Sequence, residues 1–319
     1  MPRQVKPSMY VSGLSAWRPD EVLTNADLAK LVDTSDEWIV EHVGIRERRK
    51  SPADLPVHQM GAAAARLALA GEDLSSIDLV ICGLSVADYE IPATANLVAS
   101  EAGLIQAACL DVRAACSSFV FGLHVLRGLL ATGQHKKALL VIPEAYTHVT
   151  DYRDRNSCVL WGDAAVACLV SADPPVRGGF AVEDTRVGSR STGWEAITVK
   201  KGGHFVQKGP VVQAFAIRKM ATIVGDQLKA SGLEVKDVDW FVGHQANGGI
   251  LRTVCALAGF RPEQSLTNIE RFGNTGAAGA PSVLADHQGH LKDRERVVVA
   301  TVGAGLSWGT ALLRVVGPR

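Results

Sequence analysis

The chain has 319 residues, of which 47% are hydrophobic and 21% charged, a composition typical of a globular enzyme with a large core. Lys plus Arg and Asp plus Glu number 33 each, so no net charge favours nucleic acid or an anionic membrane as a partner. The sequence contains no apolar run of membrane-spanning length and no recognisable signal peptide. Its six cysteines form no C-x-x-C pair, and no zinc-ligand spacing is present, which predicts free thiols, no metal site and a cytoplasmic protein.

Strand and helix patterns alternate along the first half of the chain. Apolar periodicity predicts strands at 10–14, 78–85, 109–112, 138–142 and 165–171, and helices at 25–32, 34–40, 58–70, 93–102 and 117–130. Ser35 is the expected N-cap of the second helix. The basic stretch 44–50, G-I-R-E-R-R-K, is interpreted as a solvated surface loop.

The second half of the chain repeats features of the first. L-S-S-I-D-L-V at 74–80 resembles V-K-D-V-D-W-F at 235–241, and W-G-D-A-A at 161–165 resembles W-G-T-A-L at 308–312. Two such matches in the same chain order indicate a duplication. Because D-P-P at 173–175 interrupts the pattern, the sequence predicts an α/β fold with two similar lobes, residues 1–172 and 173–319.

Cys116 lies between the short apolar strand and an apolar helix that begins at Ser117. A thiol at a helix N-terminus meets the positive end of the helix dipole, which favours the thiolate. Ser117 and Ser118 can accept hydrogen bonds from the free amides of the first helical turn. Cys116 is therefore a candidate nucleophile, with a buried structural cysteine as the alternative interpretation.

Two polar insertions stand out in the second half. H-Q-A-N begins at His244 after a strand, and Asn274 lies within G-N-T-G. An imidazole titrates near neutrality and can act as a base or a donor, while an amide can donate to an oxyanion. Taken singly, these residues would be a strand-end histidine and a turn-forming asparagine. The segment 302–309, V-G-A-G-L-S-W-G, allows its backbone to approach a ligand closely.

Seven motifs in the same order make the chain similar to the β-ketoacyl-acyl carrier protein synthase III family, which has the thiolase fold. They are N-A-D-L at 25–28, T-S-D-E-W-I-V at 34–40, G-I-R-E-R at 44–48, D-V-R-A-A-C-S-S-F at 111–119, W-G-D-A-A at 161–165, H-Q-A-N at 244–247 and G-N-T-G-A-A at 273–278. S-W-G-T-A-L near the C-terminus completes the set. The resemblance covers essentially the whole chain, and it implies two duplicated lobes in an α-β-α-β-α sandwich.

The resemblance implies a triad of Cys116, His244 and Asn274. In the family, the cysteine takes an acyl group from a coenzyme A or carrier-protein thioester, and no cofactor is permanently bound. A malonyl thioester then loses carbon dioxide and attacks the acyl group, while His and Asn hold the enolate, in fatty acid, polyketide or antibiotic biosynthesis. The oxyanion hole uses the backbone amides of Cys116 and of Ala304, where the family usually has Gly.

The coenzyme A groove of the family is only partly matched. The resemblance assigns coenzyme A and pantetheine contacts to Thr34, Trp38, Arg155 and Asn247. The groove Arg of the family is instead His42, and a groove Asn is replaced by Pro210.

The basic face that docks the acyl carrier protein in the family is also altered. The expected Lys and Arg positions hold Ala214, Gly249, Ala256 and Leu257. Arg218 and Arg252 lie about one turn further along the same helix faces, so either they form a shifted docking patch or the protein docks a different partner. Ile91 occupies the segment that in the family crosses a homodimer interface to line the acyl pocket.

Two other functions are weighed against condensation. An acyltransferase relative, which moves the acyl group to a hydroxyl, an amine or a second carrier, tends to have Asp where this chain has Asn274, so Asn274 favours condensation. A non-catalytic partner subunit loses the nucleophile, so Cys116 disfavours that function. The expected partners are a second copy of the chain, an acyl carrier protein and a small acyl thioester.

Overall fold

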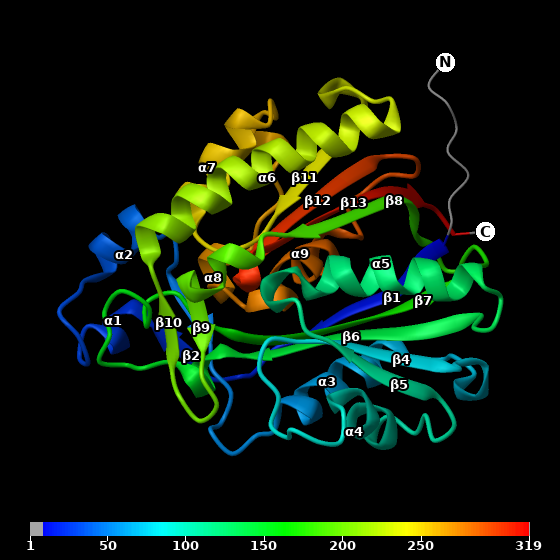
Figure 1. Cartoon of the computed structure of the whole chain (residues 1–319), viewed down its shortest axis with the longest axis horizontal. Coiled ribbons are helices and arrows are strands. Elements are labelled where there is room, and N and C mark those ends of the chain that lie inside the picture. Colours follow the sequence, from blue (N-terminus) through cyan, green and yellow to red (C-terminus); the bar gives the residue numbers. More distant parts are fainter. Residues whose placement is uncertain (1–8, 319) are drawn as a thin grey trace.

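A mixed nine-stranded sheet forms the frame of the computed structural model, which describes residues 9–318 (Figure 1). The strand order is β11-β12-β13-β8-β1-β7-β6-β4-β5. The strands are β1 Met9–Trp17, β4 Leu79–Gly83, β5 Ala108–Val112, β6 Lys137–Ala145, β7 Asp163–Ser171, β8 Gly179–Ser189, β11 Trp240–Gly243, β12 Arg296–Gly303 and β13 Ser307–Val316. Two short two-stranded antiparallel sheets pair β2 Val22–Thr24 with β3 Glu47–Arg49, and β9 Ile197–Val199 with β10 Phe205–Gln207.

The strand order repeats on either side of the β1–β8 pair. From β1 through β7 and β6 to β4, two antiparallel pairings are followed by a parallel one. The series from β8 through β13 and β12 to β11 has the same pairings. This repeat agrees with the internal sequence matches, and we propose residues 172 and 173 as the boundary between the lobes.

Helices form three layers with the two halves of the sheet between them (Figure 1). The middle layer holds α5 Ser118–Ala131 and α9 Gly279–His287. The outer layers are α3 Val57–Ala68 with α4 Thr94–Glu101, and α6 Gly209–Ser231 with α7 Gly248–Leu257. The expected α-β-α-β-α sandwich is confirmed. Three short helices, α1 Asn25–Leu28, α2 Asp36–His42 and α8 Ile269–Phe272, lie in the connections.

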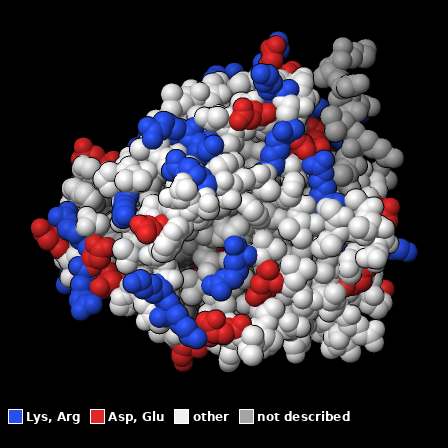
Figure 2. Space-filling model, in the orientation of Figure 1, with Lys and Arg blue, Asp and Glu red and all other residues white. Residues whose placement is uncertain are grey.

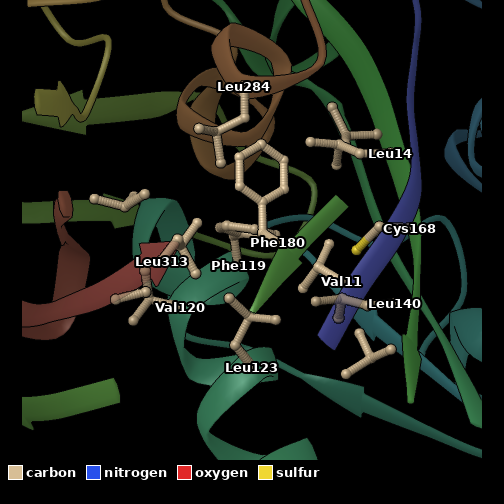
Figure 3. Packing of buried hydrophobic residues seen from close by; sticks show 14 of the residues in the cluster. Val11, Leu14, Phe119, Val120, Leu123, Leu140, Cys168, Phe180, Leu284 and Leu313 are labelled. Atoms are coloured by element: carbon tan, nitrogen blue, oxygen red, sulfur yellow. The ribbon is translucent and has the colours of Figure 1, made fainter. Parts of the chain in front are cut away.

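Helix α5 joins the two halves through a shared hydrophobic core (Figure 3). Phe119 and Leu123 of α5 belong to one buried cluster with Val11 of β1 and Phe180 of β8. Burial of each such side chain contributes about 1.5–3 kcal/mol. The helix that follows Cys116 is therefore held from both sides, which fixes the position of the thiol.

Most expected elements are present, with ends that differ by a few residues. Ser35 caps α2 as predicted, and its Oγ accepts a hydrogen bond from the amide of Trp38 at 3.1 Å. The first helix is shorter than expected and ends at Leu28. Its N-terminus is set by Thr24 and Asp27, whose side chains form a reciprocal capping box.

The interpretation of 44–50 as a solvated loop is wrong at Arg48. This residue lies in β3, and its side chain is fully buried. The guanidinium donates to Asn25 Oδ1 and to the carbonyl oxygen of Val159, both at 2.6 Å. A buried charge requires such partners, and a run of charged residues contains no sign that one of them points inward.

Candidate active site

A cavity of about 570 Å³ between the two halves brings Cys116, His244 and Asn274 together. The three residues come from separate connections: the turn before α5, the end of β11 and the loop after α8. Ligand sites in α/β folds gather at strand ends of this kind. All three residues of the expected triad thus line one cavity, and their catalytic roles stay a prediction.

Cys116 lies in a tight turn, Ala115–Ser117, between β5 and α5. The φ angle of Ala115 is 47°, in the left-handed region that residues with a Cβ rarely adopt. Ser118 Oγ accepts a hydrogen bond from the amide of Ala114 at 3.0 Å, and Ser117 makes no capping bond. The expected capping of the first turn of α5 by these two serines is therefore wrong.

The protonation state of Cys116 also differs from the expectation. Burial, together with the charge of the Glu144 carboxylate, raises the pKa of the Cys116 thiol to about 12. Desolvation of the thiolate is the largest cause of this rise. The expectation that the turn favours a thiolate is therefore wrong, and Cys116 is a neutral thiol at pH 7.

His244 follows β11, and its backbone amide donates to the carbonyl oxygen of Ala300 on β12 at 2.8 Å. Burial lowers the pKa of the imidazole to about 4, so His244 is neutral at pH 7 and has one N–H to donate. Among the described residues, its Nδ1 has no hydrogen-bond partner. The next residue, Gln245, fixes this loop because its side chain accepts from Thr267 Oγ1 and donates to the carbonyl of Gly243, both at 2.7 Å.

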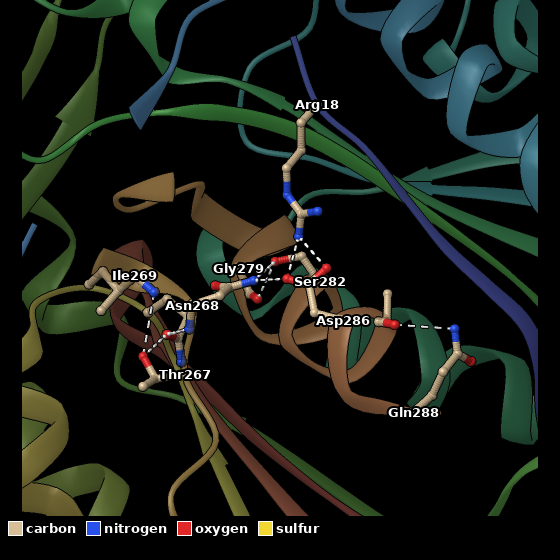
Figure 4. A network of polar contacts seen from close by, with 10 residues as sticks. Arg18, Thr267, Asn268, Ile269, Gly279, Ser282, Asp286 and Gln288 are labelled. Carbon is tan, nitrogen blue, oxygen red and sulfur yellow. Dashed lines mark hydrogen bonds and ion pairs between the residues drawn. The ribbon is translucent and has the colours of Figure 1, made fainter. Parts of the chain in front are cut away.

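A polar network supports the segment that leads to Asn274 (Figure 4). Arg18, the residue after β1, donates to both carboxylate oxygens of Asp286, at 2.9 and 2.7 Å. Its guanidinium also lies 3.9 Å from the ring centroid of Phe272. Asn268 Nδ2 donates to Asp286 at 2.8 Å. The network thus ties α8 to α9 and to the connection that follows β1.

Asn274 is held by its backbone against the first half of the chain. Its amide donates to the carbonyl of Leu160 at 2.8 Å, and its carbonyl accepts from the amide of Gly162 at 3.0 Å. The side-chain Oδ1 accepts from the amide of Gly276 at 3.0 Å. Because that bond engages the oxygen, the amide nitrogen is the atom that can donate to a ligand.

The segment of Gly303 and Ala304 lies against the Cys116 turn. A Cβ at position 303 would come within 2.9 Å of the Cys116 backbone nitrogen, so only glycine allows this approach. Ser307 Oγ donates to the carbonyl of Ala114 at 3.0 Å and fixes the contact. Ala304, the expected second oxyanion donor, lines the same cavity.

Trp38 and Asn247, two of the expected coenzyme A contacts, line the cavity. His42 and Pro210, which replace the groove Arg and Asn of the family, line it as well. The rings of Trp38 and His42 stack with centroids 4.7 Å apart. The guanidinium of Arg155 lies over Trp38, 5.1 Å from the ring centroid. Asn247 Nδ2 donates to the carbonyl of His42 at 3.0 Å. The resemblance implies that the adenine of coenzyme A binds at these residues, and their planar groups offer it surfaces for stacking.

Several expected contact residues do not line the cavity of this chain. The hydroxyl of Thr34 is buried without a hydrogen-bond partner among residues 9–318. Ile91 is 85% exposed on the connection before α4. Arg218 of α6 and Arg252 of α7 are exposed, and Lys and Arg side chains gather over part of α6 (Figure 2).

The sequence interpretation missed the aromatic side of the cavity and the buried carboxyl group next to it. Tyr146 stacks on Trp161 with centroids 4.1 Å apart, and Phe205 meets Trp161 edge-on at 4.5 Å. Glu144 is buried beside this group at the end of β6. A glutamate inside the apolar run L-L-V-I-P-E-A was the signal that could have identified it.

All six cysteines are free. Within residues 9–318, no group of three or more His, Cys, Asp or Glu side chains could hold a metal ion. No helix in the described part of the chain is both long enough and apolar enough to cross a membrane.

Comparisons with known proteins match both halves of the chain. The family model described as 3-oxoacyl-[acyl-carrier-protein (ACP)] synthase III matches residues 110–191, and the model of its C-terminal part matches 228–315. The β-ketoacyl-[acyl-carrier-protein] synthase III 2 of Deinococcus radiodurans is 36% identical over 97% of this chain and 95% of its own. The corresponding synthase III of Nitratidesulfovibrio vulgaris is also 36% identical, over 95% of this chain and 97% of its own.

Solved structures match over a similar span. The 3-oxoacyl-[acyl-carrier-protein] synthase III of Aquifex aeolicus has a TM-score of 0.91 and 31% identity, covering 96% of this chain and 99% of its own. The priming β-ketosynthase of a polyketide biosynthetic pathway has a TM-score of 0.88 and 29% identity, covering 98% of this chain and 97% of its own. The thiolase-type fold expected from the sequence is therefore confirmed.

Proposed function

We propose, from the premise that the chain belongs to the β-ketoacyl-[acyl-carrier-protein] synthase III family of condensing transferases, that it condenses an acyl group on Cys116 with a malonyl thioester. The observation that carries this proposal is the convergence of Cys116, His244 and Asn274 on one cavity. The Asn, rather than an Asp, favours condensation over simple acyl transfer.

The first half-reaction forms a thioester on Cys116. Its sulfur attacks the carbonyl carbon of an acyl-coenzyme A or acyl-carrier thioester, and the incoming pantetheine passes Trp38 and Asn247. Backbone amides of Cys116 and Ala304 stabilise the oxyanion, which is the largest contribution in many acyl transfers. Collapse of the intermediate expels the thiolate of the donor.

The second half-reaction forms a carbon–carbon bond. Loss of carbon dioxide from a malonyl thioester leaves an enolate, whose oxygen accepts hydrogen bonds from His244 and from Asn274 Nδ2. A neutral imidazole suits this role, and the lowered pKa of His244 keeps it neutral. The enolate carbon attacks the acyl group, and the Cys116 sulfur leaves.

Carbon dioxide release tests the proposal directly. The protein is incubated with a panel of acyl thioesters and labelled malonyl donors on coenzyme A and on carrier protein, and intact mass identifies acyl-Cys116. We expect acylation, which Cys116→Ala abolishes, followed by release of labelled carbon dioxide. Acylation without carbon dioxide from any donor would favour the acyltransferase function, and acylation that persists in Cys116→Ala would refute the nucleophile.

We also propose that two copies of the chain associate along β5. This strand ends the sheet, so its outer edge lacks a partner strand within the described residues. Ile105, just before β5, is 86% exposed, and Ile91 and Tyr89 on the connection between β4 and α4 are 85% and 53% exposed. An open edge strand favours pairing. Light scattering at micromolar concentration should give the mass of a dimer, in which Ile91 would line the acyl pocket of the partner.

The proposed partners are acyl carrier protein and small acyl thioesters, with Arg218 and Arg252 as the carrier contacts. Such exposed cations attract the acidic surface of a carrier and raise its association rate. The free thiols support the proposal of a cytoplasmic protein.

A further inference from the structure

The thiol of Cys116 must pass its proton to an acceptor, and His244 is a poor one because burial disfavours its charged form. The oxygen of Tyr146 lies 3.8 Å from Cys116 Sγ, within hydrogen-bond range for sulfur. We propose that Tyr146 is a further catalytic residue, which takes the thiol proton and relays a proton through Ser85 to Glu144. This inference rests on the proposed acylation of Cys116.

Two of the three hydrogen bonds of the relay point the same way, towards Glu144. Tyr146 Oη donates to Ser85 Oγ at 2.8 Å, and Ser85 Oγ donates to Glu144 Oε1 at 2.7 Å. Both hydroxyl protons are thus directed towards the carboxylate. The oxygen of Tyr146 is left with its acceptor capacity for the Cys116 S–H.

Glu144 is a buried carboxylate with no ion-pair partner among the described residues. Its other bonds come from backbone amides, Ser85 at 3.2 Å and Ala277 at 3.1 Å. Burial raises the pKa of Glu144 to about 8, so it can both accept and return a proton near neutral pH. The titratable and charged groups around it are Cys116, Tyr146 and Asp163, and Arg113 donates to the carbonyl of Ser85.

The acylation step balances with this relay. The S–H bond of Cys116 breaks as Tyr146 Oη gains that proton, Tyr146 passes its own hydroxyl proton to Ser85, and Ser85 passes its own to Glu144. The sulfur electron pair forms the bond to the carbonyl carbon. The sulfur of the donor thioester, bonded to the same carbonyl carbon, leaves with the electron pair of its bond. It takes a proton from Tyr146, which regains one from Glu144 through Ser85. Glu144 ends as the carboxylate.

The variants Tyr146→Phe and Ser85→Ala interrupt the relay. Tyr146→Phe keeps the ring that stacks on Trp161, and Ser85→Ala keeps the bond of Glu144 to Ala277. We expect single-turnover acylation of Cys116 to fall about a hundredfold in each, the usual scale for a lost general base. Ser85→Thr should restore most of the rate, and Tyr152→Phe, a half-buried tyrosine outside the cavity, is the matched control.

The pH dependence separates a relay from a structural role. The wild-type acylation rate should rise as the pH passes about 8, where Glu144 becomes the carboxylate that accepts the proton. In Glu144→Gln this rise should disappear. Variants with unchanged rates and an unchanged pH profile would overturn the relay.

Alkylation of Cys116 by iodoacetamide tests the relay without any acyl substrate. The relay predicts slower alkylation at pH 8 in Glu144→Gln, with an unchanged thermal midpoint as the check on folding. A purely electrostatic effect predicts the opposite, because removing the negative charge lowers the pKa of Cys116. Faster or unchanged alkylation would therefore refute the relay. Failure of the wild type to acylate with any thioester would instead refute the proposed function.

Discussion

The backbone amide of Asn274 donates to the carbonyl oxygen of Leu160 at 2.8 Å, so the first half of the chain positions a proposed active-site residue of the second. A second hydrogen bond, from the amide of Gly162 to the carbonyl of Asn274, makes the contact an isolated parallel β-bridge between two connections of the chain. The W-G-D motif at 161–163 thus serves the site through its backbone as well as through the Trp161 ring. Preorganised donors of this kind cost no reorganisation during reaction.

Replacing Asn274 should separate the two half-reactions. Asn274→Ala removes one of two enolate donors, so carbon dioxide release from a malonyl thioester should fall about a hundred- to a thousandfold. Acyl-Cys116 should still form, because acylation uses backbone amides. Asn274→Asp should also release little carbon dioxide, since a carboxylate repels a forming enolate. Equal loss of both half-reactions would contradict this assignment.

Gly303→Ala should impair acylation by moving the oxyanion segment. The added Cβ would meet the Cys116 backbone nitrogen at 2.9 Å, a distance that forces the turn to shift. We expect at least a tenfold lower acylation rate, on the order of the effect of a displaced oxyanion donor. Gly128→Ala, on the exposed face of α5 with no atom within 4 Å, is the control and should leave the rate unchanged.

His244 should make the protein less stable in acid. Its folded pKa of about 4 lies below the ordinary value of 6.5, so the unfolded chain binds its proton more readily. Stability from this residue is therefore present above pH 6.5 and lost as the pH falls towards 4, by up to about 3 kcal/mol. Urea unfolding of His244→Asn should show a correspondingly weaker loss between these pH values. An identical acid dependence in both proteins would show that the imidazole is not desolvated.

Charge reversal should test the shifted docking patch. Arg218→Glu combined with Arg252→Glu should slow turnover with acyl carrier protein and reduce its salt dependence, because exposed charges act mainly on association. Self-acylation from a small coenzyme A thioester should be unchanged. Lys229→Glu, further along α6, is the matched control. Unchanged carrier kinetics would place the docking surface elsewhere.

The sequence by itself determined the family and most of the element order, and it predicted the triad. Cys116 and His244 stand in motifs whose local pattern, a strand followed by a polar turn, predicts strand-end positions, and Asn274 stands in the G-N-T-G motif. These signals are short-range, so they survive without knowledge of the partners of each segment. The same holds for Ser35, whose capping role depends only on the residues that follow it.

Only the tertiary structure decided the protonation states and the inner wall of the site. Burial and Glu144, a residue 28 positions further along the chain, raise the pKa of the Cys116 thiol. Three features join segments that are distant in sequence: the relay through Ser85, the buried side chain of Arg48, and the contact of Gly303 with the Cys116 turn. Desolvation and hydrogen bonding depend on which groups surround an atom in space, and a linear pattern does not contain that information.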